Sequence, residues 1–265
     1  MSTEALQLEA ILAALPEAIG AQLASARLIE ETGSTQDDAL AEPIPESGAA
    51  LFLAERQTAG QGRRGRRWIA PPGAAITLSL ARRFNRSPSQ MAGLSLAVGV
   101  AIAEALHAQG FPQVRLKWPN DLQVDGRKLG GILVTLRADR ERCAAVIGIG
   151  LNLRLPAEAA EAIDQPWIDL AALVDPPPPR NALIAALLAQ LLPILDGFDA
   201  QGLAPLQSRW QALDALVGQT VQVIEGEAHH VGLCLGIAPD GALRLRDLDG
   251  VVREHRSGDA SLRRA

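Results

Sequence analysis

The spacing of the apolar residues changes twice along this chain, and these changes divide it into three parts. Over residues 4–15, apolar side chains return every three or four positions, which predicts an amphipathic helix that ends at Pro16. A second short helix is predicted over about residues 17–25. Residues 1–25 are therefore expected to form an N-terminal helical extension.

The middle part, residues 26–214, mixes strand and helix patterns, which indicates an α+β domain. Alternating or continuous apolar runs predict strands over residues 49–57, 75–83 and 143–153. Helical patterns begin after the cap Ser87 and continue later, over about residues 180–198 and 203–214. The helix after Ser87 is apolar nearly all round, so it is expected to be buried.

A β-hairpin is predicted inside residues 114–136, a stretch of strand composition. Asp125-Gly126 is a strong signal for a two-residue turn. This turn places Lys128 just beyond it, facing back towards residues 118–121. Two glycines follow within the second strand, which indicates that another group approaches that backbone closely.

From residue 217 onwards, short alternating runs recur every eight to twelve residues, separated by turn sequences. The expected strands lie at about residues 219–225, 229–237, 242–248 and 251–256. This spacing predicts a small all-β barrel domain, residues 215–265. His229 and His230 are adjacent and so face opposite sides of a strand. Without further ligands, they are interpreted as surface or half-buried residues rather than as a metal site.

The net charge of −5 limits the classes of partner that the protein can have. The chain has 265 residues, of which 48% are apolar, so a sizeable core can form. An acidic protein lacks the net basic surface that general binding to a phosphate backbone requires. About 30 residues precede the first motif, too few for a winged helix-turn-helix. We therefore expect no nucleic-acid partner.

The two cysteines, Cys143 and Cys234, lie far apart in apolar, strand-like stretches. They predict buried reduced thiols rather than a disulfide framework or a metal site. No apolar run approaches the roughly 18 residues that span a bilayer, and no signal peptide is visible. These features predict a cytoplasmic protein with no membrane partner.

A glycine- and arginine-rich stretch, AERQTAGQGRRGRRW at residues 54–68, has the composition of an anion-binding loop. Its glycines allow the backbone to turn sharply and to bring N–H groups close to a ligand. Its four arginines offer guanidinium forks for phosphate or carboxylate, and Trp68 offers a flat face for stacking. Taken alone, such a basic run is also typical of a solvated patch or of a nucleic-acid contact.

Three further motifs accompany this loop: STQ at residues 34–36, KWPNDLQVDGRKLGGIL at 117–133 and GIGLN at 148–152. Taken alone, STQ is typical of a helix cap and GIGLN of a bulged core strand. All four motifs in this order, followed by a small β domain, resemble the biotin–protein ligase family. The resemblance extends from about residue 26 to the end, and it is to the short class that lacks an N-terminal DNA-binding domain.

The resemblance implies a fold and a reaction. The fold would be a mixed sheet with flanking helices, related to class II aminoacyl-tRNA synthetases, followed by a small barrel of the Src-homology-3 type. Biotin's carboxylate would attack the α-phosphate of ATP, with Mg²⁺, to give biotinyl-5′-adenylate and diphosphate. The ε-amine of a lysine on a biotin carboxyl carrier protein would then take the biotinyl group and release AMP. The resemblance implies a monofunctional enzyme, either a monomer or a weak homodimer.

The resemblance also assigns roles to individual residues. Lys128 and Arg63 are the expected catalytic residues, because positive charge is required where two anions meet. The expected biotin-binding residues are Ser34, Thr35, Gln36, Gln57, Gln61, Gly62, Arg63 and Lys128. The expected ATP- and adenylate-binding residues are Gly60, Arg63, Arg66, Trp68, Lys117, Asn120, Asp121, Lys128 and Asn152.

Some of these roles have alternatives. Trp68 has the alternative of a core aromatic residue, and Lys117 is equally typical of a surface lysine. Asn120 and Asp121 are expected near the phosphates, where they either hold Mg²⁺, for which Asp121 is the candidate, or orient Lys128 or the incoming lysine. The metal ligands stay open at this point.

Two residues depart from the family's pattern. Gln61 stands where the family usually has Arg, and Gln36 where it usually has Asn. Both residues keep hydrogen-bonding capacity, so these departures are expected to change the affinity for the ligand more than the function. Two other functions also remain open: a lipoate–protein ligase or octanoyl transferase on the same fold, and a nucleic-acid-binding regulator that uses the RRGRR run.

Overall fold

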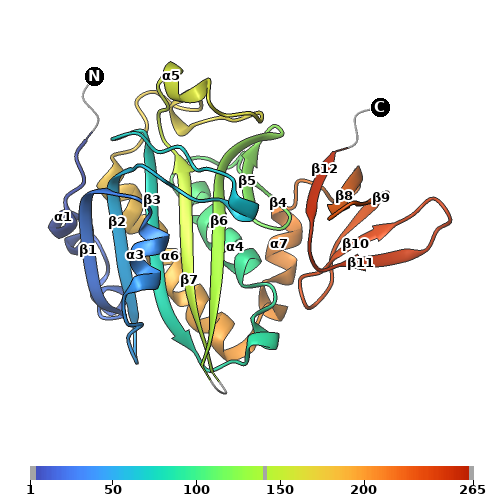
Figure 1. Ribbon diagram of the computed structural model, residues 1–265, viewed down its shortest axis with the longest axis horizontal. Helices are drawn as coiled ribbons and strands as arrows, with labels where there is room; N and C mark the ends of the chain where they lie inside the picture. The colour runs from blue at the N-terminus through green and yellow to red at the C-terminus, as the bar shows by residue number, and fades with distance from the viewer. Residues whose placement is uncertain (1–3, 140–141, 263–265) are drawn as a thin grey trace.

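The main feature of the computed structural model, which describes residues 4–139 and 142–262, is a seven-stranded mixed sheet (Figure 1). Its strand order is β1-β2-β3-β7-β6-β5-β4. β1 runs parallel to β2, and the other neighbouring strands are antiparallel. The strands are β1 Leu23–Thr32, β2 Ala49–Gln57, β3 Ala75–Phe84, β4 Arg115–Lys117, β5 Asp121–Val124, β6 Arg127–Asp139 and β7 Arg142–Asn152.

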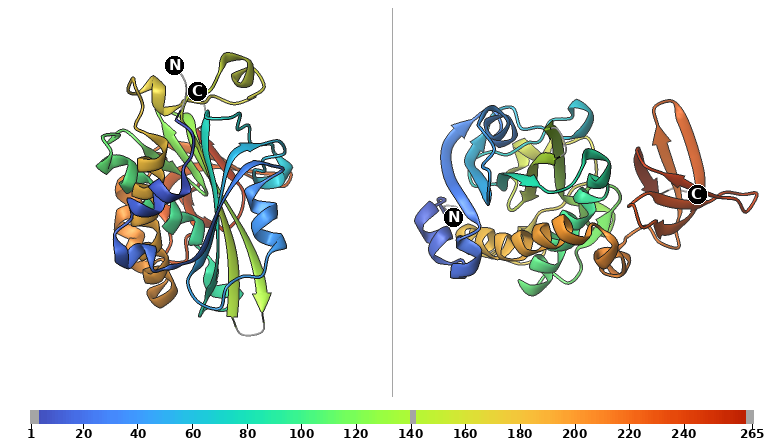
Figure 2. Two further views of the ribbon diagram at one scale, coloured as in Figure 1. Left: turned by 90° about the vertical axis from the view of Figure 1, so that its left-hand side faces the viewer. Right: turned by 90° about the horizontal axis from the view of Figure 1, so that it is seen from below.

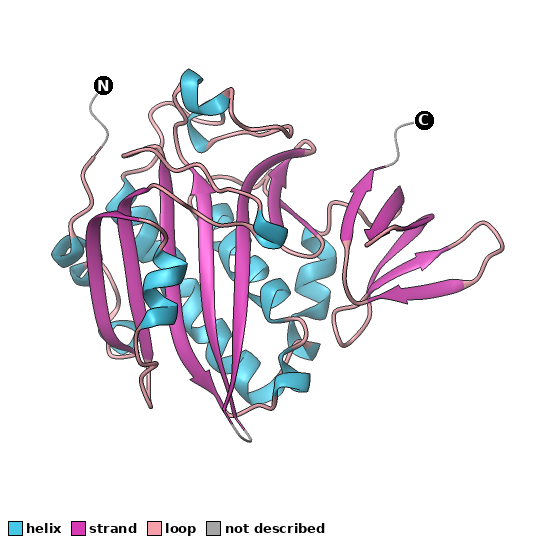
Figure 3. Cartoon of the chain, viewed as in Figure 1, coloured by secondary structure: helices cyan, strands magenta, loops and turns pink. Residues whose placement is uncertain are grey.

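Helices cover the two faces of this sheet unequally. α4 and α6 pack against each other behind the sheet in Figure 1, with α7 against α4 and with α1 and α2 against α6. α3 contacts β2, β3 and β7 from the opposite face, in front of the sheet. Figure 3 shows that loops and a short helical turn cross the upper part of this front face. The helices are α1 Leu8–Ala13, α2 Glu17–Gly20, α3 Thr35–Ala41, α4 Leu94–Ala108, α5 Ala157–Ala160, α6 Arg180–Gln201 and α7 Gln207–Leu213.

The three strands predicted from apolar runs are confirmed as β2, β3 and β7, within one residue at each end. The predicted hairpin is also confirmed, because β5 and β6 pair in antiparallel across Asp125-Gly126, whose φ angles are 50° and 75°. The prediction of a helix over residues 17–25 is wrong in its second half. α2 ends at Gly20, and Leu23–Thr32 forms β1, because pairing with β2 decides the structure of this short, ambiguous segment.

The long helix predicted after Ser87 does not begin there. Residues Pro88–Met91 form a 3₁₀ turn, and Gly93 then adopts a left-handed conformation with φ 84° before α4 begins at Leu94. A Cβ at Gly93 would lie 2.7 Å from a methyl carbon of Leu203, so glycine is required by both conformation and space. The expected burial of this helix is confirmed, since most of its side chains lie in the core.

A second, antiparallel sheet of five strands follows, with the order β11-β10-β9-β8-β12. Figure 2 shows it beside the main domain, and the indole Nε1 of Trp118 joins the two by donating to the carbonyl oxygen of Gly241 at 3.0 Å. Four strands agree with the predicted ones, whereas β12 was missed. The strands are β8 Thr220–Glu225, β9 Ala228–Ile237, β10 Leu243–Arg246, β11 Val252–His255 and β12 Asp259–Leu262.

The predicted limits of the three parts, at residues 25 and 214, stay predictions. Residues 1–3 of the expected extension and 263–265 of the expected barrel lie outside the described residues. The expected buried thiols are confirmed: Cys143 and Cys234 are both free and buried. Burial raises the pKa of the Cys234 thiol to about 11.

Two helical segments, Pro88–Ala108 and Arg180–Gln201, are long and apolar enough to cross a membrane by length and composition. The expectation that no run approaches this length was therefore wrong. Inside the fold, however, 67% and 61% of their apolar windows are buried. The two segments contain α4 and α6, the core helices that cover the back of the large sheet.

Candidate active site

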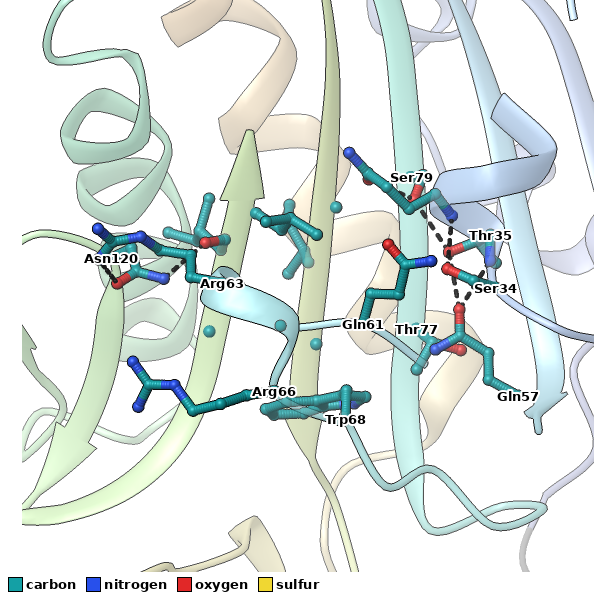
Figure 4. A pocket seen from close by; sticks show the side chains of 18 of the residues that line it. Ser34, Thr35, Gln57, Gln61, Arg63, Arg66, Trp68, Thr77, Ser79 and Asn120 are labelled. Carbon is teal, nitrogen blue, oxygen red and sulfur yellow. Dashed lines mark hydrogen bonds between the residues drawn. The ribbon is translucent and has the colours of Figure 1, made fainter. Parts of the chain in front are cut away.

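One pocket lies on the front face of the large sheet, between α3, the arginine-rich loop and the β5–β6 hairpin. Polar side chains line both of its ends, and apolar side chains lie between them. In Figure 4, Arg63 and Asn120 stand on one side, and Ser34, Thr35, Gln57 and Ser79 on the other, with Gln61 between them. The predicted residues that line it are Ser34, Thr35, Gln36, Gln57, Gln61, Gly62, Arg63, Arg66, Trp68, Asn120, Asp121 and Lys128.

The neutral end of the pocket is built by the start of α3 and the end of β2. Ser34 caps α3, and its hydroxyl accepts from the backbone N–H of Gln36 at 3.2 Å. Gln57 Oε1 accepts from the backbone N–H of Thr35 at 2.7 Å, and the Thr35 hydroxyl lies 2.9 Å from that of Ser79. The helix-cap interpretation of STQ is therefore confirmed for Ser34, and Ser34, Thr35 and Gln36 also line the pocket.

The side-chain amide of Gln36 is held by hydrogen bonds to the protein through both its nitrogen and its oxygen. Its Nε2 donates to the Thr135 hydroxyl at 3.0 Å and to the Val146 carbonyl oxygen at 3.1 Å, and its Oε1 accepts from Ser79 at 3.3 Å. A Cβ at Gly148 would lie 2.6 Å from that Oε1. The longer amide is thus accommodated by the missing side chain at Gly148, and its hydrogen bonds shape the pocket floor.

The arginine-rich loop folds back on itself over the sheet. Gly62 N–H donates to the Arg66 carbonyl oxygen at 2.7 Å, and Trp68 N–H donates to that of Gly60 at 2.8 Å. A Cβ at Gly60 would lie 2.5 Å from the Trp68 carbonyl oxygen, so this glycine permits the two arms of the loop to meet. Gln61 Nε2 donates to Asp37 Oδ2 at 2.7 Å, which ties the loop to the first turn of α3.

Trp68 lies with its indole ring directly over Gly150 on β7. A Cβ at Gly150 would come within 2.4 Å of the ring, and the indole Nε1 is buried without a hydrogen-bond partner among the described residues. β7 pairs with both neighbours without a register shift, so the predicted bulge at GIGLN is absent from these pairings. Gly148 and Gly150 instead make room for the side chains of Gln36 and Trp68.

The cationic end of the pocket is built on the β5–β6 hairpin. Lys128 Nζ lies 2.8 Å from Asp121 Oδ1, which confirms the predicted orientation of Lys128 towards residues 118–121. Both side chains are more than four fifths buried, at 18% and 17% exposed. Asn120 Nδ2 donates to the Ile132 carbonyl oxygen at 2.8 Å, and its Oδ1 accepts from Arg63 Nη1 at 3.1 Å. Asp121 and Asn120 thus position one cation each.

Asp259, on β12 of the second sheet, contacts three arginines of the loop. Its carboxylate lies 3.2 Å from Arg63 Nη1, 3.2 Å from Arg64 Nη1 and 2.7 Å from Arg66 Nη2. Burial lowers the pKa of the Arg63 guanidinium, whereas Asp259 acts in the opposite direction, and a guanidinium keeps its charge in either case. Nothing in the sequence pattern indicated this link between the two sheets.

Three predicted residues lie outside the lining, as far as the described residues define it: Gly60, Lys117 and Asn152. The buried Asn152 Nδ2 donates to the Ile168 carbonyl oxygen at 3.0 Å and more weakly to that of Lys128 at 3.4 Å. Its amide therefore supports the backbone behind Lys128. Lys117 is half-buried on β4, away from the lining.

Sequence analysis missed several lining residues. Two of these, Thr77 and Ser79, could have been recognised from the sequence, because they are the polar residues of an alternating strand. Ile132, Leu133 and Ile149 add apolar surface between the two polar ends. Gln165 comes from an irregular segment with no recognisable pattern.

Known proteins resemble this chain in sequence. The profile of the Biotin/lipoate A/B protein ligase family matches residues 26–152. The Biotin--[acetyl-CoA-carboxylase] ligase of Mycobacterium tuberculosis is 35% identical over 242 residues, which cover 88% of this chain and 86% of that protein. This chain belongs to the biotin–protein ligase family. The family's ligase from Paracoccus denitrificans is likewise 35% identical, over 83% of this chain and 93% of its own length.

Other members of the family differ in length or in sequence. The Bifunctional ligase/repressor BirA of Escherichia coli is 41% identical over 217 residues, which cover 80% of this chain but 66% of that protein, slightly under two thirds of its length. Among solved structures, the biotin protein ligase from Aquifex aeolicus in complex with biotin and ATP has a TM-score of 0.75 at 23% identity. It covers 91% of this chain and 100% of its own, so the large mixed sheet with a C-terminal antiparallel sheet is the family's fold.

Proposed function

We propose that the protein is an ATP-dependent biotin–protein ligase, which activates biotin as biotinyl-5′-adenylate and transfers it to a lysine of a biotin carboxyl carrier protein. The observation that carries this proposal is the polarity of the pocket on the front face of the large sheet. Neutral hydrogen-bonding groups occupy one end, and Arg63 occupies the other (Figure 4). Lys128 also lines the pocket and is paired with Asp121, the neighbour of the Asn120 that holds Arg63. An acid with a neutral polar ring and a nucleotide would fit side by side in it.

In the proposed first step, a carboxylate oxygen of biotin attacks the α-phosphorus of ATP, and the bond to the β-phosphate breaks to release diphosphate. Two anions approach each other, so fixed positive charge lowers the barrier. We assign to Lys128, which Asp121 holds at 2.8 Å, the contact with both anions. We assign to Arg63, which Asn120 holds at 3.1 Å, the binding of the phosphates as a fork.

The neutral end of the pocket is proposed to bind the ureido ring of biotin. This ring presents both donors and acceptors, which hydroxyl and amide side chains can match. Ser34, Thr35 and Gln57 lie together there, and Gln36 supports them from below. The apolar surface between the two ends would contact biotin's aliphatic chain.

In the proposed second step, the neutral ε-amine of the carrier lysine attacks the carbonyl carbon of the mixed anhydride. The bond to the phosphate oxygen breaks, AMP leaves, and the amine loses a proton as the amide forms. The anhydride hydrolyses readily, so exclusion of water is essential. The loop over the pocket, closed by its own backbone hydrogen bonds and by Gln61, would provide that exclusion.

Mg²⁺ is proposed to enter with ATP and to neutralise charge on the phosphates. Among the described lining residues, Asp121 is the carboxylate, and one of its oxygens already contacts Lys128. One protein carboxylate together with phosphate oxygens suits Mg²⁺, which usually keeps several waters. Asp121 therefore fits as a ligand without leaving Lys128 unsupported.

The expectations about fold relationships, monofunctionality, location and oligomeric state are also proposals. We propose that the five-stranded sheet is a barrel of the Src-homology-3 type and that the large sheet is related to class II aminoacyl-tRNA synthetases. We also propose a monofunctional ligase, not a repressor, acting in the cytoplasm as a monomer or weak homodimer. The net charge of −5 supports the absence of a nucleic-acid partner.

The proposed function is tested by ATP–diphosphate exchange with purified protein and Mg²⁺, in which biotin, lipoate and no acid are compared. Exchange that depends on biotin is expected, followed by transfer of biotin to a carrier domain. Exchange with lipoate and not with biotin would mean that the protein is an adenylating enzyme whose substrate is lipoate. No exchange with either acid would refute a ligase and leave a binding protein on this fold.

Asp259→Asn is expected to tighten the binding of ATP by about fivefold. The Asp259 carboxylate pairs with three loop arginines, and two of them, Arg63 and Arg66, are expected to bind phosphate. Partly exposed ion pairs contribute roughly 0.2–1 kcal/mol each. Without these pairs to break, the free energy of ATP binding should become more favourable by about 1 kcal/mol. Titration calorimetry of ATP in the absence of biotin, where no adenylate can form, measures this change.

Asp247→Asn is the matched control for this prediction. Asp247 pairs with Arg253 at 3.0 Å within the second sheet, so its loss removes an equal charge without touching the loop. ATP affinity should change by less than about twofold in this variant. If Asp259→Asn instead weakened ATP binding, Asp259 would be a residue that positions the arginines for phosphate rather than a competitor.

A further inference from the structure

Outside the pocket, three side chains that can bind metal converge at one point of the second sheet. Glu225 ends β8, His230 lies in β9 and His255 ends β11. Glu225 Oε2 lies 3.7 Å from His230 Nε2 and 3.3 Å from His255 Nδ1. One ligand atom from each residue lies within 4.8 Å of the other two.

These separations are those of a metal-ligand set. Zn²⁺ binds imidazole nitrogen and carboxylate oxygen at about 2.0–2.2 Å, and tetrahedral ligand atoms then lie roughly 3.3–3.6 Å apart. The two Glu225 distances, 3.3 and 3.7 Å, already fall close to that range. A small movement of the His230 side chain, which is 38% exposed, would complete the set.

His255 is fixed in its place at the meeting point of the three side chains. The ring is 4% exposed, so it has little freedom to turn away. Its Nδ1 faces the Glu225 carboxylate at 3.3 Å.

The site is closed on one side and open on the other. His255 forms its buried floor, while Glu225 and His230 are 28% and 38% exposed. A hollow in the surface runs past His230 and His255 and is also lined by Asp247 and Arg253. Three protein ligands and access to solvent leave room for a water molecule as the fourth ligand.

We propose that Glu225, His230 and His255 bind a divalent transition-metal ion of the Zn²⁺ class. Two neutral imidazoles and one carboxylate are ligands that Zn²⁺ accepts, whereas Mg²⁺ and Ca²⁺ prefer oxygen alone. A bound ion would tie the edge strand β11 to the β8–β9 hairpin. The sequence interpretation of His229 and His230 rejected a metal site because the other two ligands become neighbours only on folding.

Binding of Zn²⁺ to the full chain, measured by equilibrium dialysis with metal analysis, tests the proposal. One ion per chain is expected, with affinity reduced at least tenfold in His230→Gln and in Glu225→Gln. The matched control is His229→Gln, because His229 faces the other side of β9 and its Nδ1 contacts Gln222. Wild-type affinity is expected in the control. The proposal fails if the chain binds no Zn²⁺, or if His230→Gln and His229→Gln behave alike.

Co²⁺ gives a second measurement that does not depend on ligase activity. Four-coordinate Co²⁺ in the site should produce visible absorption bands that are present in His229→Gln and absent from His230→Gln. Since the ion binds the folded chain, Zn²⁺ should also raise the Tm, by several degrees at a hundredfold excess over Kd. Equal Co²⁺ spectra in the two variants, or an unchanged Tm, would contradict the proposal even if some Zn²⁺ binds.

Discussion

Replacing Lys128 with alanine is expected to reduce biotin-dependent ATP–diphosphate exchange by about 10²–10³-fold, the usual cost of losing one fixed charge-stabilising donor. The Nζ group is largely buried and held at 2.8 Å by Asp121, so its position requires no reorganisation during the reaction. Biotin should still bind measurably, because the residues at the neutral end of the pocket are unchanged. Exchange rate and biotin affinity, measured on the same preparation, separate these two effects.

Two variants serve as controls for the Lys128 experiment. Lys117→Ala removes the same charge from β4, outside the pocket lining, and should retain most activity. If the single variant is unstable, the double variant Lys128→Ala with Asp121→Asn avoids leaving a largely buried carboxylate unpaired. It is compared with Asp121→Asn alone, because Asp121 is itself proposed to bind Mg²⁺. Near-normal exchange by a folded Lys128→Ala protein would remove this lysine from the catalytic role.

Arg63→Gly is expected to release biotinyl-adenylate into solution and to lower its retention by about tenfold or more. Hydrogen bonds to a charged group contribute roughly 1.5–3 kcal/mol, and Arg63 contributes a guanidinium directed into the pocket beside Asn120. The adenylate should still form, although more slowly, because Lys128 remains. Radiolabelled adenylate that stays with the protein through rapid gel filtration gives the retained fraction.

Arg64→Gly is the control within the same loop. Arg64 lies outside the pocket lining and adopts a φ of 56°, a conformation that glycine favours, so this change removes a charge without backbone strain. Retention of the adenylate should stay near the wild-type level. Equal leakage from both variants would mean that loop flexibility, and not the Arg63 guanidinium, governs retention.

The sequence was sufficient to predict those parts of the fold in which local pattern and tertiary structure agree. Alternation located β3, and a continuous apolar run located β2 and β7. β1 could not be recognised, because its ten residues form a strand through pairing with β2 rather than through their own pattern. β12 has only four residues and likewise depends on its pairing with β8.

The site shows the same limit. The motifs located Lys128 and Arg63, but the meaning of the glycines in GIGLN required coordinates, since Gly148 and Gly150 make room for side chains from α3 and the loop. Asn152 carries the motif's polar group and yet supports the backbone. Contacts between residues far apart in sequence, such as Arg63 with Asp259, leave no local pattern at all.

The contact between Asp259 and the loop changes what the RRGRR run offers to a long polymer. Three of its arginines share the single carboxylate of Asp259, which belongs to the chain itself and offsets one of their three positive charges. A stiff nucleic-acid strand would have to displace this carboxylate while lying across two domains. A triphosphate is short and flexible, so it can exchange with the carboxylate one arginine at a time. The contact is therefore expected to disfavour a long, stiff polyanion at the loop more than a short, flexible one.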